Sequence, residues 1–341
     1  MVQWLGMPVQ PYFFGPCRDA FFAGGFSLLA LVAFFLLDSP DTAAWSLRAS
    51  LLLLWFVNWP HFSATLQRLY HSKENILAHP FSALVSPLLF AGLGAIVLCS
   101  PLYASVPVHL YALWAPFHFS SQSLGISFIY ARRSGIELSL WQRRAFVWFC
   151  HSSFLAMTAQ VESSTTLQRF GVVSYPTLGV PTFLVPVALA VFGGCFIFWL
   201  WTLIQWKRKN ERALPWIVLL PISTQVIWFT LGPFSSSFNQ LVPMFHSLQY
   251  LPIVWWMSMK EEGVSLRASF QWARTNFLGG AVLFWGLPSA IALAGFPLDL
   301  AQIAVFTAIN LHHFYIDGII WKLRNPRVSS PLMGTLAHVA R

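Results

Sequence analysis

Long runs of apolar residues dominate the sequence, and the short loops between them carry most of the charge. A helix needs about 20 apolar residues to cross the hydrocarbon core of a bilayer. Charged residues make up only 9% of the 341 residues, whereas soluble domains average about 25%. We therefore predict an all-α, polytopic integral membrane protein that forms a single transmembrane domain over residues 1–341.

About ten runs are long enough to be transmembrane helices. In chain order the predicted spans are Ala20–Leu37, Leu47–Leu69, Phe81–Ser100, Val106–Tyr130, Arg144–Gln160, Pro181–Trp206, Leu214–Leu231, Gln240–Met259, Phe270–Ala294 and Leu300–Leu323.

The loop charges support this count, because clusters of Lys and Arg precede the first run and follow every second run. Cytoplasmic loops carry an excess of Lys and Arg, so both termini are predicted to be cytoplasmic in a bacterial-type inner (plasma) membrane. The opposite side receives most of the acidic loop residues, with Arg169 as the main exception. The net charge of +9 thus comes from basic residues in the cytoplasmic loops, which set the topology and contact membrane lipid. We therefore expect no nucleic-acid partner.

Four cysteines are scattered without a CxxC pair, which predicts neither a disulfide framework nor a thiolate metal site. They are Cys17, Cys99, Cys150 and Cys195.

The segment Pro60–Ser63 is similar to Phe117–Ser120, and both belong to spans that run in the same direction. This similarity suggests a hairpin repeat around residues 47–70 and 106–130.

The candidate ligand histidines lie inside four of the apolar runs, where charged residues are nearly absent. A polar group in hydrocarbon costs several kcal/mol unless it is partnered, and one shared cation would remove several such penalties together. Neutral imidazole binds Fe, Zn and Cu. We therefore predict a metal site formed by His61, His118, His246, His312 and His313. The alternative is that each ring bonds its own neighbouring helix.

His312 and His313 are adjacent, so their side chains point about 100° apart on one helix. The two rings are therefore not expected to face the same site together. Asp317 lies four residues after His313, the spacing of a metal ligand and a carboxylate that orients it. The same carboxylate would supply the negative charge that a divalent cation needs inside a membrane.

Two further polar residues share a helical face with a candidate ligand. Gln122 lies four residues after His118 and is expected to orient the imidazole or a bound water. Tyr250 lies four residues after His246, where its phenol would donate to an oxygen species at the metal or cap the imidazole. We predict that Gln122, Tyr250 and Asp317 surround the metal and take part in the chemistry.

The remaining histidines are weaker candidates. His151 lies on the fifth predicted span, whereas His71, His79, His109 and His338 fall in loops, at an interface or in the tail and are expected to be solvated. No HExxH, HxxxH or ExxH motif occurs, so the soluble di-iron and zincin patterns are absent.

Pro60-His61, His118-Phe119 and His246-Ser247-Leu248 resemble motifs of the Brp/Blh family. Members of that family are polytopic membrane iron dioxygenases that cleave β-carotene, and they hold one Fe(II) with four histidines from separate helices. By this resemblance His61, His118 and His246 would be ligands. The sequence departs from the family where Tyr250 replaces its second late histidine, so the fourth ligand would be His312 or His313.

These patterns favour a His-ligated non-haem iron enzyme that uses O2 to oxygenate, desaturate or cleave a lipophilic substrate. Zinc or copper would suit the same ligands. A haem protein or quinone-linked electron carrier is an alternative, although haem uses only one or two axial histidines. A proton-coupled transporter or assembly factor is a third reading.

Overall fold

The computed structural model describes residues 10–37, 39–100, 102–323 and 326–333. Within these residues the chain is mostly helical with one two-stranded sheet, which confirms the all-α class. The elements are α1 (Pro16–Ala20), η1 (Phe21–Gly25), α2 (Phe26–Leu36), α3 (Pro40–Leu53), η2 (Leu54–Asn58), α4 (Trp59–Tyr70), α5 (Lys73–Ala78), η3 (Phe81–Val85), α6 (Ser86–Cys99), α7 (Ser105–Arg133), α8 (Leu140–Glu162), β1 (Gln168–Phe170), β2 (Val173–Tyr175), α9 (Leu184–Asn210), α10 (Trp216–Thr230), η4 (Gly232–Phe234), α11 (Ser236–Asn239), α12 (Val242–Glu262), α13 (Leu266–Ala281), η5 (Val282–Gly286), α14 (Leu287–Leu293), α15 (Leu298–Ile320) and α16 (Pro326–Met333).

Six continuous helices in the described part of the chain are long and apolar enough to cross a membrane. They are Pro16–Leu36, Phe81–Cys99, Leu184–Asn210, Trp216–Phe234, Leu266–Leu293 and Leu298–Ile320. The other four predicted spans lie in α3–α4, α7, α8 and α12, which are long but contain more Ser, Gln, His, Trp and Pro. The protein therefore has the helices of a membrane protein, and the count of ten spans stays a prediction.

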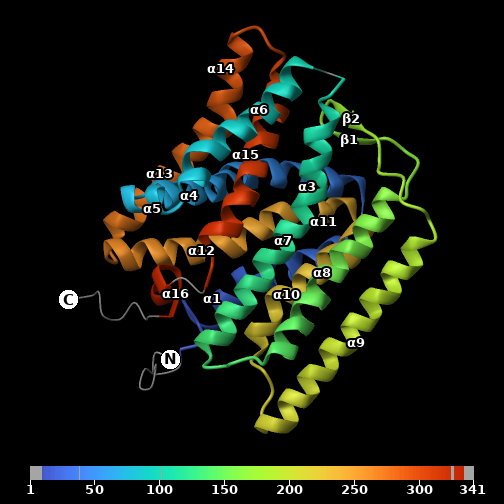
Figure 1. The fold of residues 1–341 in the computed structure, drawn as a ribbon, viewed down its shortest axis with the longest axis vertical. Helices are drawn as coiled ribbons and strands as arrows, with labels where there is room; N and C mark the ends of the chain where they lie inside the picture. The colour runs from blue at the N-terminus through green and yellow to red at the C-terminus, as the bar shows by residue number, and fades with distance from the viewer. Residues whose placement is uncertain (1–9, 38, 101, 324–325, 334–341) are drawn as a thin grey trace.

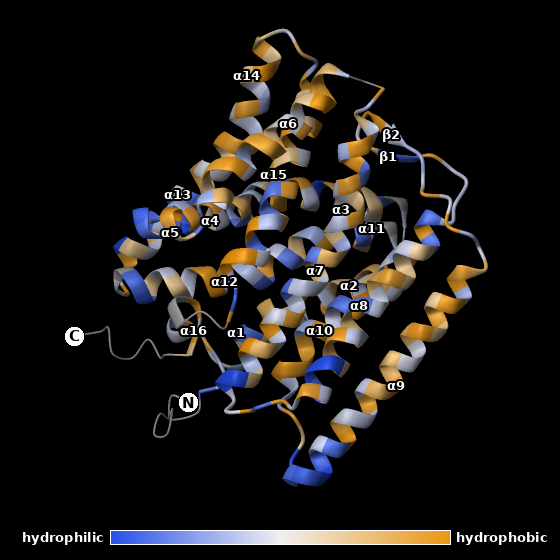
Figure 2. Cartoon of the chain, in the orientation of Figure 1, coloured by the Kyte–Doolittle hydropathy of each residue, from blue (hydrophilic) through white to orange (hydrophobic). Residues whose placement is uncertain are grey.

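The helix α9 lies at the outer edge of the bundle, alongside α8 (Figure 1). Most of its large apolar side chains are exposed, including Ile197 and Trp201. The helix is apolar along most of its length and hydrophilic at its basic end (Figure 2). This is the pattern of a helix whose surface meets lipid and whose end meets water.

The centre of the bundle is formed by α4, α7, α12 and α15, which bring distant parts of the sequence together (Figure 1). The helix α13 lies directly against α4, and its Gly279 and Gly280 make the close approach possible. A Cβ atom on Gly280 would lie 2.6 Å from the backbone carbon of Trp59. Small residues commonly allow such backbone contact between membrane helices.

The two ends of the described chain lie at the same face of the bundle. Arg133, in the last turn of α7, donates to the carbonyl oxygen of Tyr12 over 2.8 Å and also to that of Leu332 in α16. The Asp19 carboxylate accepts from the backbone N–H groups of Phe13 and Phe14. The beginning and end of the described residues thus meet at the basic end of α7, and the cytoplasmic placement of the termini stays a prediction.

The histidines outside the predicted metal site agree only in part with expectation. His109 was predicted to be solvated, but it is partly buried, with its Nε2 3.1 Å from both carboxylate oxygens of Glu162 and its ring against Tyr175. His71 is exposed and His79 is half-buried, whereas His338 lies outside the described residues. The four cysteines are free, and Cys150 is buried.

Candidate metal centre

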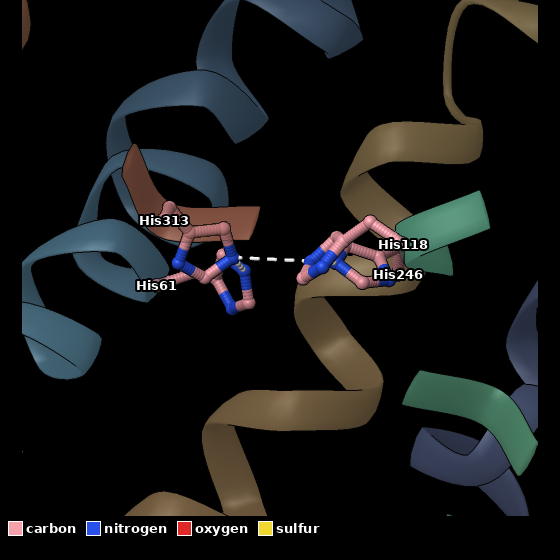
Figure 3. Close-up of side chains that lie close together, drawn as sticks. All are labelled: His61, His118, His246 and His313. Carbon is pink, nitrogen blue, oxygen red and sulfur yellow. Dashed lines mark hydrogen bonds between the residues drawn. The ribbon is translucent and has the colours of Figure 1, made fainter. Parts of the chain in front are cut away.

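Four helices each contribute one buried histidine to a single cluster. The residues are His61 of α4, His118 of α7, His246 of α12 and His313 of α15, and we call them the four-histidine cluster. One ring nitrogen from each residue lies within 4.8 Å of the other three. Figure 3 shows the rings of His61 and His313 facing those of His118 and His246. Each side chain is at most 5% exposed, so the cluster is shielded from solvent.

The Nε2 atoms are too close to one another to be explained by hydrogen bonds alone. Nε2 of His313 lies 2.9 Å from that of His61 and 3.2 Å from that of His118, and Nε2 of His118 lies 3.1 Å from that of His246. A neutral Nε2 carries either one proton or one lone pair. Four such atoms can therefore make only two good hydrogen bonds with one another, whereas three short contacts are present.

A metal ion would resolve this conflict, because every Nε2 could then direct its lone pair to the same point. Metal–nitrogen bonds of about 2.1 Å at right angles place adjacent ligand atoms about 3.0 Å apart. The three short Nε2 contacts, from 2.9 to 3.2 Å, fit that spacing. The cluster could therefore hold a metal with little movement of the side chains.

Aromatic packing fixes the orientation of the four imidazoles. The ring partners, with centroid distances, are Tyr250 on His61 at 4.3 Å, Phe314 on His118 at 4.5 Å, Phe119 on His246 at 4.3 Å and Phe62 on His313 at 4.7 Å. The Nδ1 atoms of His61, His246 and His313 have no hydrogen-bond partner among the described residues. These rings are thus held by packing, whereas metal-bound histidines usually donate this second nitrogen to an oxygen.

The adjacent His312 points away from the cluster. Its Nε2 lies 3.5 Å from the Ser82 carbonyl oxygen, and its ring lies near Phe90. The side chain lines a separate apolar cavity of about 450 Å³ between α6, α14 and α15. The structure therefore brings His313 into the cluster and leaves the predicted candidate His312 outside it. His151 also lies outside, against Phe117.

Asp317 lies beside the cluster, as its spacing predicts. Its Oδ2 is 3.5 Å from Nε2 of His313 and 3.9 Å from Nε2 of His118. Its Oδ1 lies 3.4 Å from the Tyr250 hydroxyl. A carboxylate is thus present where a bound cation would need a negative charge.

Tyr250 and Gln122 also lie at the cluster, but their contacts differ from those expected. The Tyr250 hydroxyl lies 2.6 Å from the Thr65 hydroxyl and accepts from the Trp321 indole N–H over 3.0 Å. The Gln122 amide donates over 2.8 Å to the backbone carbonyl of His246, not to a ring. Gln122 therefore positions α12 against α7.

Sequence reasoning missed Thr65 and Trp321. Thr65 lies four residues after His61, and Trp321 lies four residues after Asp317. The same helical spacing that pointed to Tyr250 would therefore have identified both.

A cavity of about 360 Å³ adjoins the cluster and runs beside α7. Polar groups from His118, Gln122, Tyr250 and Asp317 face it, and most of the remaining wall is apolar. The full lining is Trp114, Phe117, His118, Ser121, Gln122, Gly125, Ile126, Ile129, Tyr250, Ile253, Phe314, Asp317, Gly318, Trp321 and Leu323, and we call it the α7 cavity. A Cβ atom on Gly125 or Gly318 would meet nothing within 4 Å. Both glycines therefore leave open space where larger side chains would project.

Scans of protein-family models, of curated proteins and of solved structures each find no match for this chain. The assignment of a role therefore depends on the geometry of the site.

Proposed function

We propose that this protein is a membrane-embedded non-haem iron enzyme that oxidises a lipophilic substrate with O2. The observation that carries the proposal is the four-histidine cluster, whose ligand nitrogens gather within 4.8 Å in a buried site. The six apolar helices and the basic loops support a place in a bacterial-type inner membrane with both termini cytoplasmic.

Iron is proposed because the four imidazoles lie next to a cavity that could hold a substrate. Four neutral imidazoles suit Fe, Zn or Cu by donor type. His118, Asp317 and Tyr250 line the α7 cavity, so a metal in the cluster would be close to a space large enough for a substrate. Fe(II) with an open coordination position supplies O2 binding and activation. The chain's own residues exclude water and hold the substrate beside the ligands.

A haem fits the site less well. Haem uses one or two axial histidines, and four imidazoles with ligand nitrogens within 4.8 Å of one another leave no room for a macrocycle between them.

A proton-transporting role is less well supported than the enzyme. Asp317 is the one acidic side chain within salt-bridge distance of the cluster among the described residues, whereas proton transport usually uses several such groups.

The shape of the α7 cavity favours an elongated substrate. Its lining residues on α7 extend from Trp114 to Ile129, a distance of about 22 Å at 1.5 Å per residue. His118 is about one turn from the Trp114 end, so the metal would lie beside one part of a long molecule. We propose a lipid or isoprenoid chain whose apolar body packs along α7.

Oxygen-dependent conversion of a lipid tests this function. The iron-loaded protein in detergent is incubated with total lipid extract of the expression host and ascorbate as electron donor, with isotopically labelled O2 or without O2. We expect O2-dependent oxygenated, cleaved or desaturated products by mass spectrometry, and none from the His118→Ala protein. An iron-loaded wild-type protein that consumes no O2 and converts no lipid would contradict the proposal.

A second prediction tests the place of the substrate. Gly125→Leu should fill the middle of the α7 cavity, since a side chain there projects into open space and not into protein. We expect turnover to fall at least about tenfold, as for misplaced substrates generally, while metal content stays unchanged. The matched control is Gly194→Leu on exposed α9, where a Cβ atom also meets nothing. Equal turnover by the two variants would place the substrate elsewhere.

A further inference from the structure

We infer that the Asp317 carboxylate is itself a ligand of the metal, which makes the site one of four histidines and one aspartate. The inference rests on the proposed metal centre and changes its composition. Asp317 lies in the last turns of α15, one helical turn after His313, so both side chains extend from the same face.

The position of the carboxylate oxygen carries the inference. In an octahedral site with bonds of about 2.1 Å, adjacent ligand atoms are about 3.0 Å apart and opposite ones about 4.2 Å apart. The Asp317 Oδ2 lies 3.5 Å from Nε2 of His313 and 3.9 Å from Nε2 of His118. Both distances lie between these two values, so a small shift of the carboxylate would bring Oδ2 to a ligand's distance from both nitrogens.

Charge balance points the same way. Asp317 is 8% exposed, and its only ion-pair partners among the described residues are His118 and His313. A carboxylate in hydrocarbon needs a cation, because an uncompensated buried charge costs several kcal/mol. Four neutral imidazoles leave the full charge of a divalent ion uncompensated, and a carboxylate ligand would reduce it by one.

The other carboxylate oxygen is held by a group that orients the pair. Oδ1 lies 3.4 Å from the Tyr250 hydroxyl, which is itself fixed by Thr65 and Trp321. A ligating carboxylate is usually hydrogen-bonded in this way on its free oxygen. Tyr250 is then a positioning residue that directs Oδ2 toward the imidazoles.

The test replaces Asp317 by asparagine and reads the coordination of the metal directly. Full-length protein is loaded with Co(II), whose absorption spectrum changes with the number and type of ligands, and is then titrated with a chelator. We expect Asp317→Asn to alter the Co(II) spectrum and to lower metal affinity at least about tenfold. Asp317→Glu should keep a carboxylate-bound spectrum. The control is Asp299→Asn, an exposed acidic residue on the same helix, which should change neither property.

The outcomes separate this inference from the proposed function. If wild-type protein binds Co(II) and Asp317→Asn has the same spectrum, the carboxylate is not a ligand and the four-histidine site stands without it. A loss of affinity with an unchanged spectrum also overturns the inference, since it indicates an outer role. A wild-type protein that binds neither Co(II) nor iron ends the metal proposal as a whole. An amide costs less to bury than a carboxylate, so the asparagine variant is expected to fold.

Discussion

Replacement of His313 by alanine should abolish stoichiometric metal binding, whereas replacement of His312 should leave it intact. The two residues are adjacent, both are buried, and both were candidates by sequence. Only His313 places its Nε2 within 3.2 Å of two other cluster nitrogens, those of His61 and His118. The pair therefore distinguishes a shared cation from a general effect of losing a buried imidazole.

Loss of a group that merely orients a ligand costs about 10- to 100-fold in metal affinity. We expect His313→Ala to exceed about 100-fold, because it removes a ligand, and His312→Ala to change affinity by less than about threefold. Metal content after equilibration with a graded chelator measures both. Equal losses in the two variants would show that the cluster does not act as a binding site.

Replacement of Gly280 by leucine is expected to destabilise the protein and to disturb the cluster at the same time. A Cβ atom there would lie 2.6 Å from the Trp59 backbone carbon and 2.7 Å from its carbonyl oxygen. Backbone atoms cannot rotate away, so α13 and α4 must separate. Overpacking of this kind costs about 1–3 kcal/mol, and the leucine branches add to that cost. Since His61 lies two residues after Trp59, metal binding should weaken as well.

Thermal unfolding in detergent measures the first effect, and metal titration measures the second. Gly194→Leu on α9 is the control, because its Cβ projects into open space on a helix that faces outward. The control should keep wild-type stability and affinity. A Gly280→Leu protein as stable as wild type would mean that α13 and α4 do not approach as closely as the structure places them.

The sequence alone predicted the helical class and named all four cluster histidines together with His312, because hydropathy and buried polar groups are local properties. It could not choose between His312 and His313. Adjacent side chains on a helix point about 100° apart, so the two diverge, but this angle does not show which of them faces inward. That choice depends on how α15 packs against α4 and α7. The position of α15 is set by contacts between residues far apart in the chain.

The helical spacing rule found the surroundings of the site but not their contacts. Gln122 shares a face with His118, yet it bonds the His246 backbone on another helix. His109 was expected to be solvated at an interface, but Glu162 at the end of α8 lies against its ring nitrogen. Such contacts join helices through tertiary packing, which single-helix periodicity does not contain.

The span count could not be settled from hydropathy for a related reason. Three of the four cluster helices, α4, α7 and α12, are outside the set of six strongly apolar helices. They carry the polar residues that the site requires, whereas helices such as α9 and α6 are more apolar (Figure 2). Among the cluster helices, only α15 is long and apolar enough to be recognised as a span from hydropathy in the described part of the chain.

X-ray absorption at the metal edge of protein purified without chelators tests the shared cation most directly. We predict one iron per chain, with imidazole nitrogens as its principal ligands and a signal that His313→Ala abolishes. Protein that contains no stoichiometric iron, zinc or copper, even after reconstitution with each, would contradict the account. The four imidazoles would then be a hydrogen-bonded polar core and not a metal centre.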